Sequence, residues 1–412
     1  MIEHFFNLHA SNYQVDSRII KKNDVFFALK GERVDGHDFL RDIELKGAKA
    51  CIIEKDFNGY VPNIQVFRVD GVLKFLQDIA REALKKSKAF KIGITGSFGK
   101  TTTKEFLVTI LKEKYSVSST YKNYNSQIGL PLSILNMDRN VDFLVFEMGM
   151  DKKHEIENLV SFCQIDLALI TKVDLIQEGF KNVEDVAQAK KEIFLSKNIK
   201  NKILNFDLLK LKTFHNEKFI TFSIKNKNAD FYLKNSFFYE KNLKIKLFFP
   251  FSEKHFLENA LAAISIARIL NIDFETIQKG INNLKTVNMR YEKVFIKDAL
   301  FIKDFYNSNF TTMKESILSL KNYKNRKIFV LGGMPHMVNI NKNCHRKILN
   351  LAKKYSDNIF LYGKQWENLN HFVYKDLKDI ALKLNEILKK DDIVLLKSAR
   401  FYKLENIFDF IN

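Results

Sequence analysis

One glycine-rich stretch constrains the fold of this chain more than any other feature. Residues 93–103 read GITGSFGKTTT, between an apolar segment and an amphipathic one. Glycines allow backbone amides to approach phosphate oxygens, and the N-terminal end of a following helix is electropositive. The strict form of this pattern has glycine where this chain has Ile94, but the stretch still predicts a strand, a phosphate-binding loop and a helix.

The side chains after the glycines predict nucleoside triphosphate binding. Lys100 can neutralise the β- and γ-phosphates, and the hydroxyl of Thr101 or Thr102 can reach a bound Mg²⁺. Glu147 follows a second apolar segment, at a strand end where parallel sheets place ligands, and its carboxylate suits a hard cation. A solvated turn is the alternative interpretation of this acid.

The chain of 412 residues is long enough for two or three domains. From residue 90 strands and helices alternate, which predicts a mostly parallel sheet, and a second such series after 288 predicts a Rossmann-like domain. Alternating residues without a helix over 218–249 predict a small antiparallel insert. We therefore expect three α/β domains, with boundaries at 1–88, 89–287 and 288–412.

The expected elements are read from apolar periodicity. The strand candidates are 24–29, 50–53, 90–95, 142–147, 166–171, 219–224, 243–247, 328–331, 358–362 and 393–396, and the helix candidates include 72–84, 257–270 and 382–390.

Charge and cysteine content restrict the class of protein. The net charge is +19, yet only eleven of the 67 basic residues are Arg, and lysines are scattered along the whole chain. Nucleic-acid binders more often cluster Arg and aromatic residues on one face, so we expect no nucleic-acid partner. Three distant cysteines, no 18-residue apolar run and no signal-peptide pattern predict a cytoplasmic protein without zinc or membrane spans.

Five segments, in order, resemble the Mur ligases, which build the peptide of the bacterial cell wall. They are the loop 95–103, the Asn-rich segment 123–131, Glu-Met-Gly at 147–149, the lysine segment 189–193 and the helix segment 255–263. Segments 16–18, 24–31 and 35–39 resemble the uridine-nucleotide domain of the MurE and MurF types. DFYNSN at 304–309 is similar to a MurF-type motif, and the MurE-type Asp-Asn-Pro-Arg is not found.

The resemblance implies an activity and a set of binding residues. ATP would phosphorylate the terminal carboxylate of UDP-N-acetylmuramoyl-tripeptide, and the amine of D-alanyl-D-alanine would attack the acyl phosphate. Arg290 would bridge to the γ-phosphate. The nucleotide contacts would be Gly96, Ser97, Gly99, Lys100, Thr101, Thr102, Asn259, Asp304 and Asn307, and the substrate contacts Ser17, Arg18, Lys30, Gly31, Asn125 and Ser126.

The resemblance also implies that Lys190 is carbamylated. A free lysine is cationic and repels Mg²⁺, whereas a carbamate is an anion that can ligate or orient the metal. Lys190 would then join Thr101 and Glu147 around the magnesium ion. A solvated lysine on a helix, like its neighbour Lys191, is the alternative interpretation.

The chain departs from the family pattern in two regions. After Thr171 it lacks a histidine that the family places near the second magnesium, and we hypothesise that Asp174 substitutes for it. In the last third, Gly332-Gly333-Met334-Pro335-His336-Met337 lacks the family's acidic residues, and KSAR at 397–400 stands where the family has Lys-Gly-Ser-Arg.

Three other functions stay open at this stage. They are a MurE-type or folylpolyglutamate synthetase-like ligase, a non-catalytic nucleotide-binding homologue, and a basic phosphate-loop enzyme acting on nucleic acid. The segment 304–309 and the uridine-type N-terminal segments favour the MurF type, acting as a monomer whose domains close around the acyl phosphate.

Overall fold

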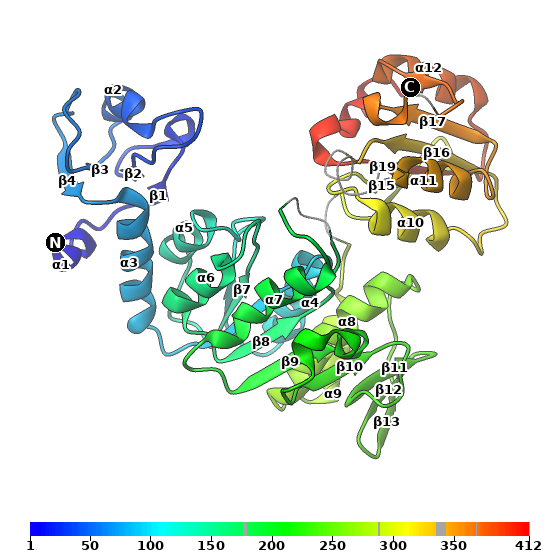
Figure 1. Ribbon diagram of the computed structural model, residues 1–412, viewed down its shortest axis with the longest axis horizontal. Coiled ribbons are helices and arrows are strands. Elements are labelled where there is room, and N and C mark those ends of the chain that lie inside the picture. The colour runs from blue at the N-terminus through cyan, green and yellow to red at the C-terminus, as the bar shows by residue number, and fades with distance from the viewer. Residues whose placement is uncertain (176–178, 287–288, 335–342, 368, 412) are drawn as a thin grey trace. The chain divides into compact units, whose positions relative to one another are not determined.

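The computed structural model describes residues 1–175, 179–286, 289–334, 343–367 and 369–411, which carry three β-sheets (Figure 1). Contacts divide the chain into two compact units. One comprises Met1–Val173, Asn182–Phe248 and Asn259–Asn282, and the other Asp174–Lys181, Phe249–Glu258 and Asn283–Asn412. The predicted boundary at 287/288 lies outside the described residues, so the three domain boundaries stay a prediction.

The first sheet has four parallel strands in chain order, β1 (Tyr13–Gln14), β2 (Val25–Phe27), β3 (Ala50–Glu54) and β4 (Gln65–Val69). Successive side chains point to opposite faces, which explains why all three residues of β2 are apolar and buried. Val25 and Phe27 join the cluster under α3 (Val72–Lys85), and Phe26 joins the cluster formed with α2 (Leu40–Leu45). A short helix, α1 (Ile2–Phe6), adds Phe5 to the first cluster.

The second sheet has nine strands in the order β13-β12-β11-β10-β9-β8-β5-β7-β6. Their bounds are β5 (Phe90–Thr95), β6 (Val117–Ser119), β7 (Phe143–Glu147), β8 (Leu167–Ile170), β9 (Asn201–Asn205), β10 (Ile220–Ser223), β11 (Phe231–Lys234), β12 (Phe237–Glu240) and β13 (Leu243–Lys246). Neighbouring strands from β6 to β11 pair in parallel, which confirms the mostly parallel sheet predicted from residue 90 onward.

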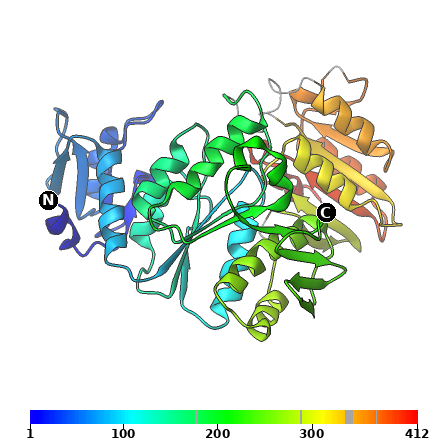
Figure 2. The same cartoon turned by 60° about the horizontal axis from the view of Figure 1, so that its bottom comes forward.

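Helices cover both faces of this sheet (Figure 2). They are α4 (Lys100–Lys112), α5 (Gly129–Asn136), α6 (Glu155–Cys163), α7 (Val183–Lys191), α8 (Lys254–Ile269) and α9 (Phe274–Asn282). Among them α9 packs against α4, and α6 contacts α7. A Cβ on Gly280 of α9 would lie 2.5 Å from Cα of Ile110, so glycine permits this close packing.

The expected antiparallel insert is only partly correct. β11, β12 and β13 form an antiparallel meander, but β10 pairs in parallel with both β9 and β11. The two predicted strands, β10 and β13, are therefore not partners, and the meander extends the large sheet. Periodicity identifies strands but carries no information about which neighbour each strand takes.

The third sheet has six strands in the order β14-β15-β19-β16-β17-β18. They are β14 (Glu292–Ile296), β15 (Ala299–Asp304), β16 (Lys327–Gly332), β17 (Asn358–Tyr362), β18 (Val373–Tyr374) and β19 (Ile393–Lys397), with helices α10 (Phe310–Ser319), α11 (Cys344–Ala352) and α12 (Leu377–Ile387). All pairs are parallel except β14 with β15. The predicted Rossmann-like sheet is confirmed.

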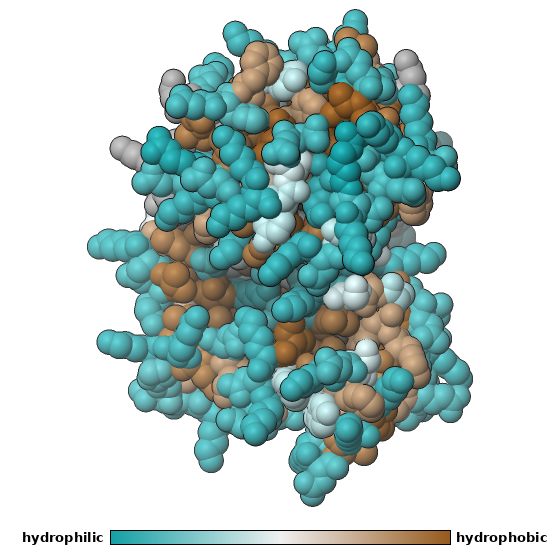
Figure 3. Space-filling model, turned by 90° about the vertical axis from the view of Figure 1, so that its right-hand side faces the viewer, coloured by the Kyte–Doolittle hydropathy of each residue, from teal (hydrophilic) through white to brown (hydrophobic). Residues whose placement is uncertain are grey.

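The surface, the helices and the cysteines can be compared with what the composition predicts. On the face shown in Figure 3, hydrophilic side chains cover most of the surface, and hydrophobic residues gather in small patches. None of the described helices has the length and apolar character needed to span a bilayer. Cys51, Cys163 and Cys344 are free and buried.

Candidate active site

The loop after β5 has backbone conformations and neighbours that require glycine. Gly96 and Gly99 have φ of 152° and 80°. A Cβ on Gly96 would lie 1.9 Å from Oγ1 of Thr171, and one on Gly99 would lie 2.4 Å from Oδ1 of Asn259. Glycine is therefore required at these two positions by the side chain of Thr171, directly after β8, and by that of Asn259 in α8, both far away in the sequence.

Hydrogen bonds fix the conformation of this loop, which leads into α4. The amide of Ser97 donates to the carbonyl of Lys172 at 2.6 Å, and the Thr171 hydroxyl donates to the carbonyl of Phe98 at 2.5 Å. Nζ of Lys100 donates to the carbonyl of Gly96 at 2.8 Å, so its ammonium group lies against the loop. This is the geometry of a phosphate-binding loop, with the cation and the helix N-terminus on one side.

Glu147 supplies a buried carboxylate beside this loop. It ends β7 in register with Ile94 of β5, and its side chain is 2% exposed. Oε1 accepts a hydrogen bond from Nδ2 of Asn125 at 2.7 Å, whereas Oε2 is buried without a hydrogen-bond partner. A buried anionic oxygen without a partner is costly, and a divalent cation is the kind of partner that would satisfy it.

The other oxygen ligands of such a cation would come from the loop and the nucleotide. Thr101 and Thr102 are buried at the start of α4, where a hydroxyl can face bound phosphates. Across the described ranges no group of three His, Cys, Asp or Glu side chains is arranged to hold a metal. The residues present thus fit Mg²⁺ shared with a nucleotide, because that ion keeps substrate and water ligands.

Lys190 lies in the last turn of α7 and is almost completely buried, with 1% of its surface exposed. Burial lowers the pKa of this ammonium well below its ordinary value, and nearby Lys100 lowers it further, against opposing effects of Asp151 and Glu192. The carboxylate of Glu192 accepts the amides of His154 and Glu157 at the start of α6. The alternative of a solvated lysine is wrong for Lys190.

In the second unit, the guanidinium groups of Arg290 and Arg400 both lie close to the ring of Tyr306. The guanidinium carbons lie 4.3 Å and 5.6 Å from the ring centroid of Tyr306. Such contacts restrict the conformations of a flexible arginine side chain. The predicted γ-phosphate contact of Arg290 stays a prediction.

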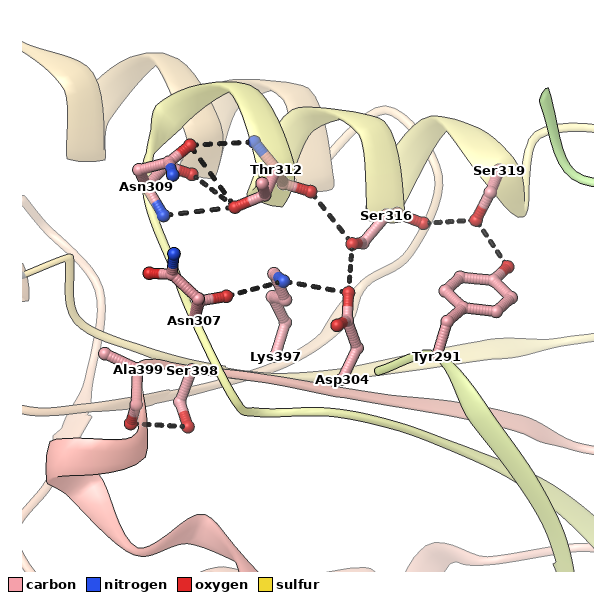
Figure 4. A network of polar contacts seen from close by, with 10 residues as sticks. All are labelled: Tyr291, Asp304, Asn307, Asn309, Thr312, Ser316, Ser319, Lys397, Ser398 and Ala399. Carbon is pink, nitrogen blue, oxygen red and sulfur yellow. Dashed lines mark hydrogen bonds and ion pairs between the residues drawn. The ribbon is translucent and has the colours of Figure 1, made fainter. Parts of the chain in front are cut away.

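Asp304 and Asn307 lie in a polar network at the carboxyl end of the third sheet (Figure 4). Nζ of Lys397 forms an ion pair with Oδ2 of Asp304 at 2.8 Å and donates to the carbonyl of Asn307 at 2.8 Å. The Ser316 hydroxyl also donates to Oδ2 of Asp304, at 2.5 Å. The nucleotide contacts predicted for Asp304 and Asn307 remain predictions, and this network orients both residues.

Lys397 is a residue whose part in this site the sequence analysis missed. Asp304 and Lys397 are directly opposite each other on the parallel pair β15 and β19. The signal was available, because both end apolar strands and carry opposite charges. The strand order that makes Asp304 and Lys397 neighbours could not be read from the sequence.

Four of the predicted substrate residues belong to loops of the first sheet, and two belong to loops of the second sheet. Ser17 and Arg18 share one turn, in which Arg18 pairs with Asp16 at 2.6 Å and the carbonyl of Ser17 accepts from Lys46. Lys30 and Gly31 begin the loop after β2, closed by a bridge from Lys30 to Asp35 and a hydrogen bond from the Gly31 amide to the carbonyl of Val34.

Asn125 and Ser126 lie in the second sheet's loops. Asn125 contacts Glu147, and the Ser126 hydroxyl accepts the amide of Gly129 at the start of α5. For both residues, contact with substrate stays a prediction.

The two regions that depart from the family pattern, after Thr171 and at residues 332–337, include residues of the second unit. Oδ2 of Asp174 accepts from the hydroxyl of Thr311 at 2.5 Å, and Oδ1 accepts the amide of Leu175. The hypothesis that Asp174 replaces the missing histidine is untested. Residues 335–337 lie outside the described residues, and Nε2 of His345 accepts the amide of Met334 at 3.0 Å.

These features define a nucleotide-binding α/β protein of the phosphate-loop class. Two family models match the chain, Mur ligase family, catalytic domain over residues 9–83 and Mur ligase middle domain over residues 94–267. UDP-N-acetylmuramoyl-tripeptide--D-alanyl-D-alanine ligase of Bacillus subtilis is 32% identical, over 95% of this chain and 91% of its own length. The ligase of the same name from Buchnera aphidicola (strain Bp) is also 32% identical, over 98% and 93%.

A solved structure supports the same relationship. The MurF ligase of Thermotoga maritima, in complex with ADP, superimposes with a TM-score of 0.84 at 28% identity and covers 98% of each chain. The chain belongs to the Mur ligase family.

Proposed function

We propose that this chain is a MurF-type ligase of peptidoglycan precursor synthesis. It joins UDP-N-acetylmuramoyl-tripeptide to D-alanyl-D-alanine and converts ATP to ADP and phosphate. Near full-length similarity to ligases of that name supports the substrates. The buried Oε2 of Glu147, without a hydrogen-bond partner beside the phosphate loop, is the observation that carries the chemistry.

The similarity to these ligases implies a reaction in two steps. A carboxylate oxygen of the tripeptide takes the γ-phosphoryl group of ATP, which leaves ADP and an acyl phosphate. The dipeptide amine then attacks the acyl carbon, the C–N bond forms, the C–O bond to phosphate breaks, and the amine proton passes to solvent. Lys100 exchanges its contact with Gly96 for phosphate oxygens, where it offsets negative charge that grows in both steps.

Magnesium would be held by Thr101, Glu147 and carbamylated Lys190, and it would supply charge stabilisation at the transferred phosphoryl group. Arg290, Asn259, Asp304 and Asn307 would contact the nucleotide. Of these, Asn259 already lies against the loop, because its Oδ1 is 3.5 Å from the Thr103 hydroxyl.

Burial supports carbamylation of Lys190. A lowered pKa leaves more of the amine neutral, and only the neutral amine attacks CO₂ to form a carbamate and release a proton. The product is an anion in place of a cation close to Lys100, so the two lysines stop repelling each other. Labelled bicarbonate should give a carbamate carbon signal in magnetic resonance spectra of the protein, and the signal should be absent in Lys190→Ala but present in the neighbouring Lys191→Ala. Loss of the signal in both variants, or in neither, contradicts the assignment.

Phosphate release from ATP tests the function itself. Release should require both UDP-N-acetylmuramoyl-tripeptide and D-alanyl-D-alanine, and the ligated product should appear by mass spectrometry. Release with a UDP-linked dipeptide and a diamino acid, or with a folate and glutamate, would instead indicate the MurE-type or folylpolyglutamate alternative. ATP binding without turnover on any of these pairs would indicate a non-catalytic homologue.

The proposal also covers the compartment, the oligomeric state and the domain boundaries of the protein. We expect a cytoplasmic monomer with domains 1–88, 89–287 and 288–412. Limited proteolysis should cut first near residues 86–89 and 283–290 in the free protein, and sedimentation should give one species of about the chain mass. Cleavage elsewhere or a stable dimer would contradict these expectations.

A further inference from the structure

The strand β6 ends in an unusual way next to the candidate metal ligand. The last backbone bond of its ladder runs from the amide of Thr120 to the carbonyl of Val145, at 3.1 Å. One step further along, the amide of Glu147 donates to the hydroxyl of Thr120 at 3.0 Å, not to a carbonyl. The Thr120 side chain, 1% exposed, thus replaces a backbone acceptor and holds the backbone of Glu147.

The carbonyl that the ladder no longer uses is bound by a buried cation. Nζ of Lys104 donates to the carbonyl of Thr120 at 2.6 Å, and the lysine side chain is 0% exposed. Its carboxylate partner is Glu105, at 2.9 Å. Burying an ammonium group is costly unless it is paired and hydrogen-bonded, so this pair of contacts fixes where Lys104 lies. Lys104 also belongs to α4, which begins at Lys100 in the phosphate loop.

The far end of the same segment holds the side chain of Glu147. Asn125 donates to Oε1 at 2.7 Å, and its own carbonyl accepts the amide of Gly149 at 2.7 Å. The segment 120–125 therefore binds Glu147 at both its backbone and its carboxylate, and leaves Oε2 as the oxygen without a partner. Neither Lys104 nor Thr120 was among the residues expected to form the site.

We propose that Thr120 and Lys104 are positioning residues that set the backbone and direction of Glu147, so that Oε2 meets a divalent cation at the nucleotide phosphates. The inference rests on the proposed function only in taking Glu147 as a metal ligand. Groups that orient a metal ligand without touching the metal change metal affinity by roughly 10–100-fold when removed. A merely structural role for Thr120 would lower stability and leave metal affinity unchanged.

The test compares Thr120→Val, which removes the hydroxyl, with Thr120→Ser, which keeps it. Mn²⁺ binding to each full-length protein saturated with ADP is measured by electron paramagnetic resonance, and ADP binding without metal by calorimetry. We expect Thr120→Val to weaken Mn²⁺ about tenfold, with metal-free ADP affinity unchanged. Thr120→Ser should stay close to the parent.

Lys104→Met, with Lys112→Met as control, tests the second contact. Lys112 is an exposed lysine on the same helix. Lys104→Met should weaken Mn²⁺ and raise the Mg²⁺ concentration needed for half-maximal ATP hydrolysis, and Lys112→Met should do neither. Thermal unfolding without ligand shows whether Lys104→Met folds; if it does not, Thr120→Val decides alone.

Three results would overturn the inference. They are unchanged Mn²⁺ affinity in Thr120→Val, an equal loss in Thr120→Ser, and a parent protein that binds no Mn²⁺ with ADP. Because Mn²⁺ binding is measured without either peptide substrate, a failure of the proposed ligase reaction would be seen separately, in the phosphate-release assay.

Discussion

At the scale of single residues, the phosphate loop depends on contacts between distant parts of the chain. Thr171 and Asn259 occupy the space that a Cβ on Gly96 or Gly99 would need. The positive φ at both glycines adds a backbone cost for any other residue. A local shift cannot relieve either cost, because hydrogen bonds tie Ser97 and Phe98 of the loop to Lys172 and Thr171.

Gly96→Ala should therefore reduce ATP affinity by about tenfold or more, since a shift of the loop costs at least ~1.4 kcal/mol of binding free energy. Titration calorimetry with ATP measures this. Gly71→Ala is the matched control, because the nearest atom to a Cβ there is 3.6 Å away and its φ is −170°. Equal ATP affinity in Gly96→Ala and the parent would show that the loop does not bind phosphate as described.

Glu147 carries a cost in stability for its role. Glu147→Gln keeps the shape of the side chain and removes the buried charge on Oε2. We expect the metal-free variant to unfold at a higher temperature, because an unsatisfied buried charged group costs about 1–3 kcal/mol or more. Its rate of phosphate release should fall by roughly 100-fold, since charge stabilisation at the phosphoryl group is lost. A variant that is both less stable and fully active would contradict this assignment.

His345 should make the second unit sensitive to acid. Burial lowers the pKa of His345 to about 4, and its ring stacks edge-on against Trp366, at 4.7 Å between centroids. An unfolded histidine takes up its proton near pH 6.5, so the unfolded state binds more protons between pH 6.5 and 4. The stability contributed by the neutral ring is complete above that window and is lost as the pH falls through it.

Urea unfolding at pH 7 and pH 5 measures this effect through the fluorescence of Trp366, the only tryptophan of the chain. From the pKa of about 4, we expect His345 to account for about 2 kcal/mol of the difference between the two pH values. The His345→Gln variant should lose that part of the difference. An identical pH dependence in both proteins would show that the pKa of His345 is the same in the folded and the unfolded state, which would contradict this prediction.

At the scale of helices and strands, most elements could be predicted and most partners could not. The strand 90–95 and the helix from residue 72 were predicted almost to the residue, because apolar periodicity and glycine positions are local signals. The parallel pairing of β10 and the pairing of β15 with β19 depend on residues far apart in the sequence. For the same reason Lys100 and Glu147 could be found from the sequence, whereas the pairing of Lys397 with Asp304 and the contacts of Thr120 and Lys104 could not.

Helix α10 offers a test of one local signal. Asn309 caps it, since its Oδ1 accepts the amide of Thr312 at 3.0 Å while the Thr312 hydroxyl accepts the amide of Asn309. Asn309→Ala should lower the free energy of unfolding of this unit by about 1 kcal/mol, as loss of a cap does. Urea unfolding followed by Trp366 fluorescence measures it, with Asn309→Asp as the variant that keeps the cap. Equal losses in both variants would contradict a capping role.

At the scale of the whole molecule, the chemistry is distributed over two units. The phosphate loop, Glu147 and Lys190 belong to the first unit, and Arg290, Asp304 and Asn307 belong to the second. The residues predicted to act on the nucleotide therefore belong to separately packed parts of the chain. This division could be anticipated from the two series of strands and helices, but the sequence contains no signal for how closely the units associate.

The nine-stranded sheet ends in the exposed strand β13, whose residues Lys244 and Lys246 alternate with Leu243 and Ile245. Nζ of Lys244 lies 4.5 Å from the ring centroid of Phe237, which keeps this cation over the end of the sheet. An open strand invites β-pairing by other chains, and cations along it make such pairing electrostatically unfavourable. We therefore expect the lysines of β13 to disfavour aggregation of folded copies through this edge of the sheet.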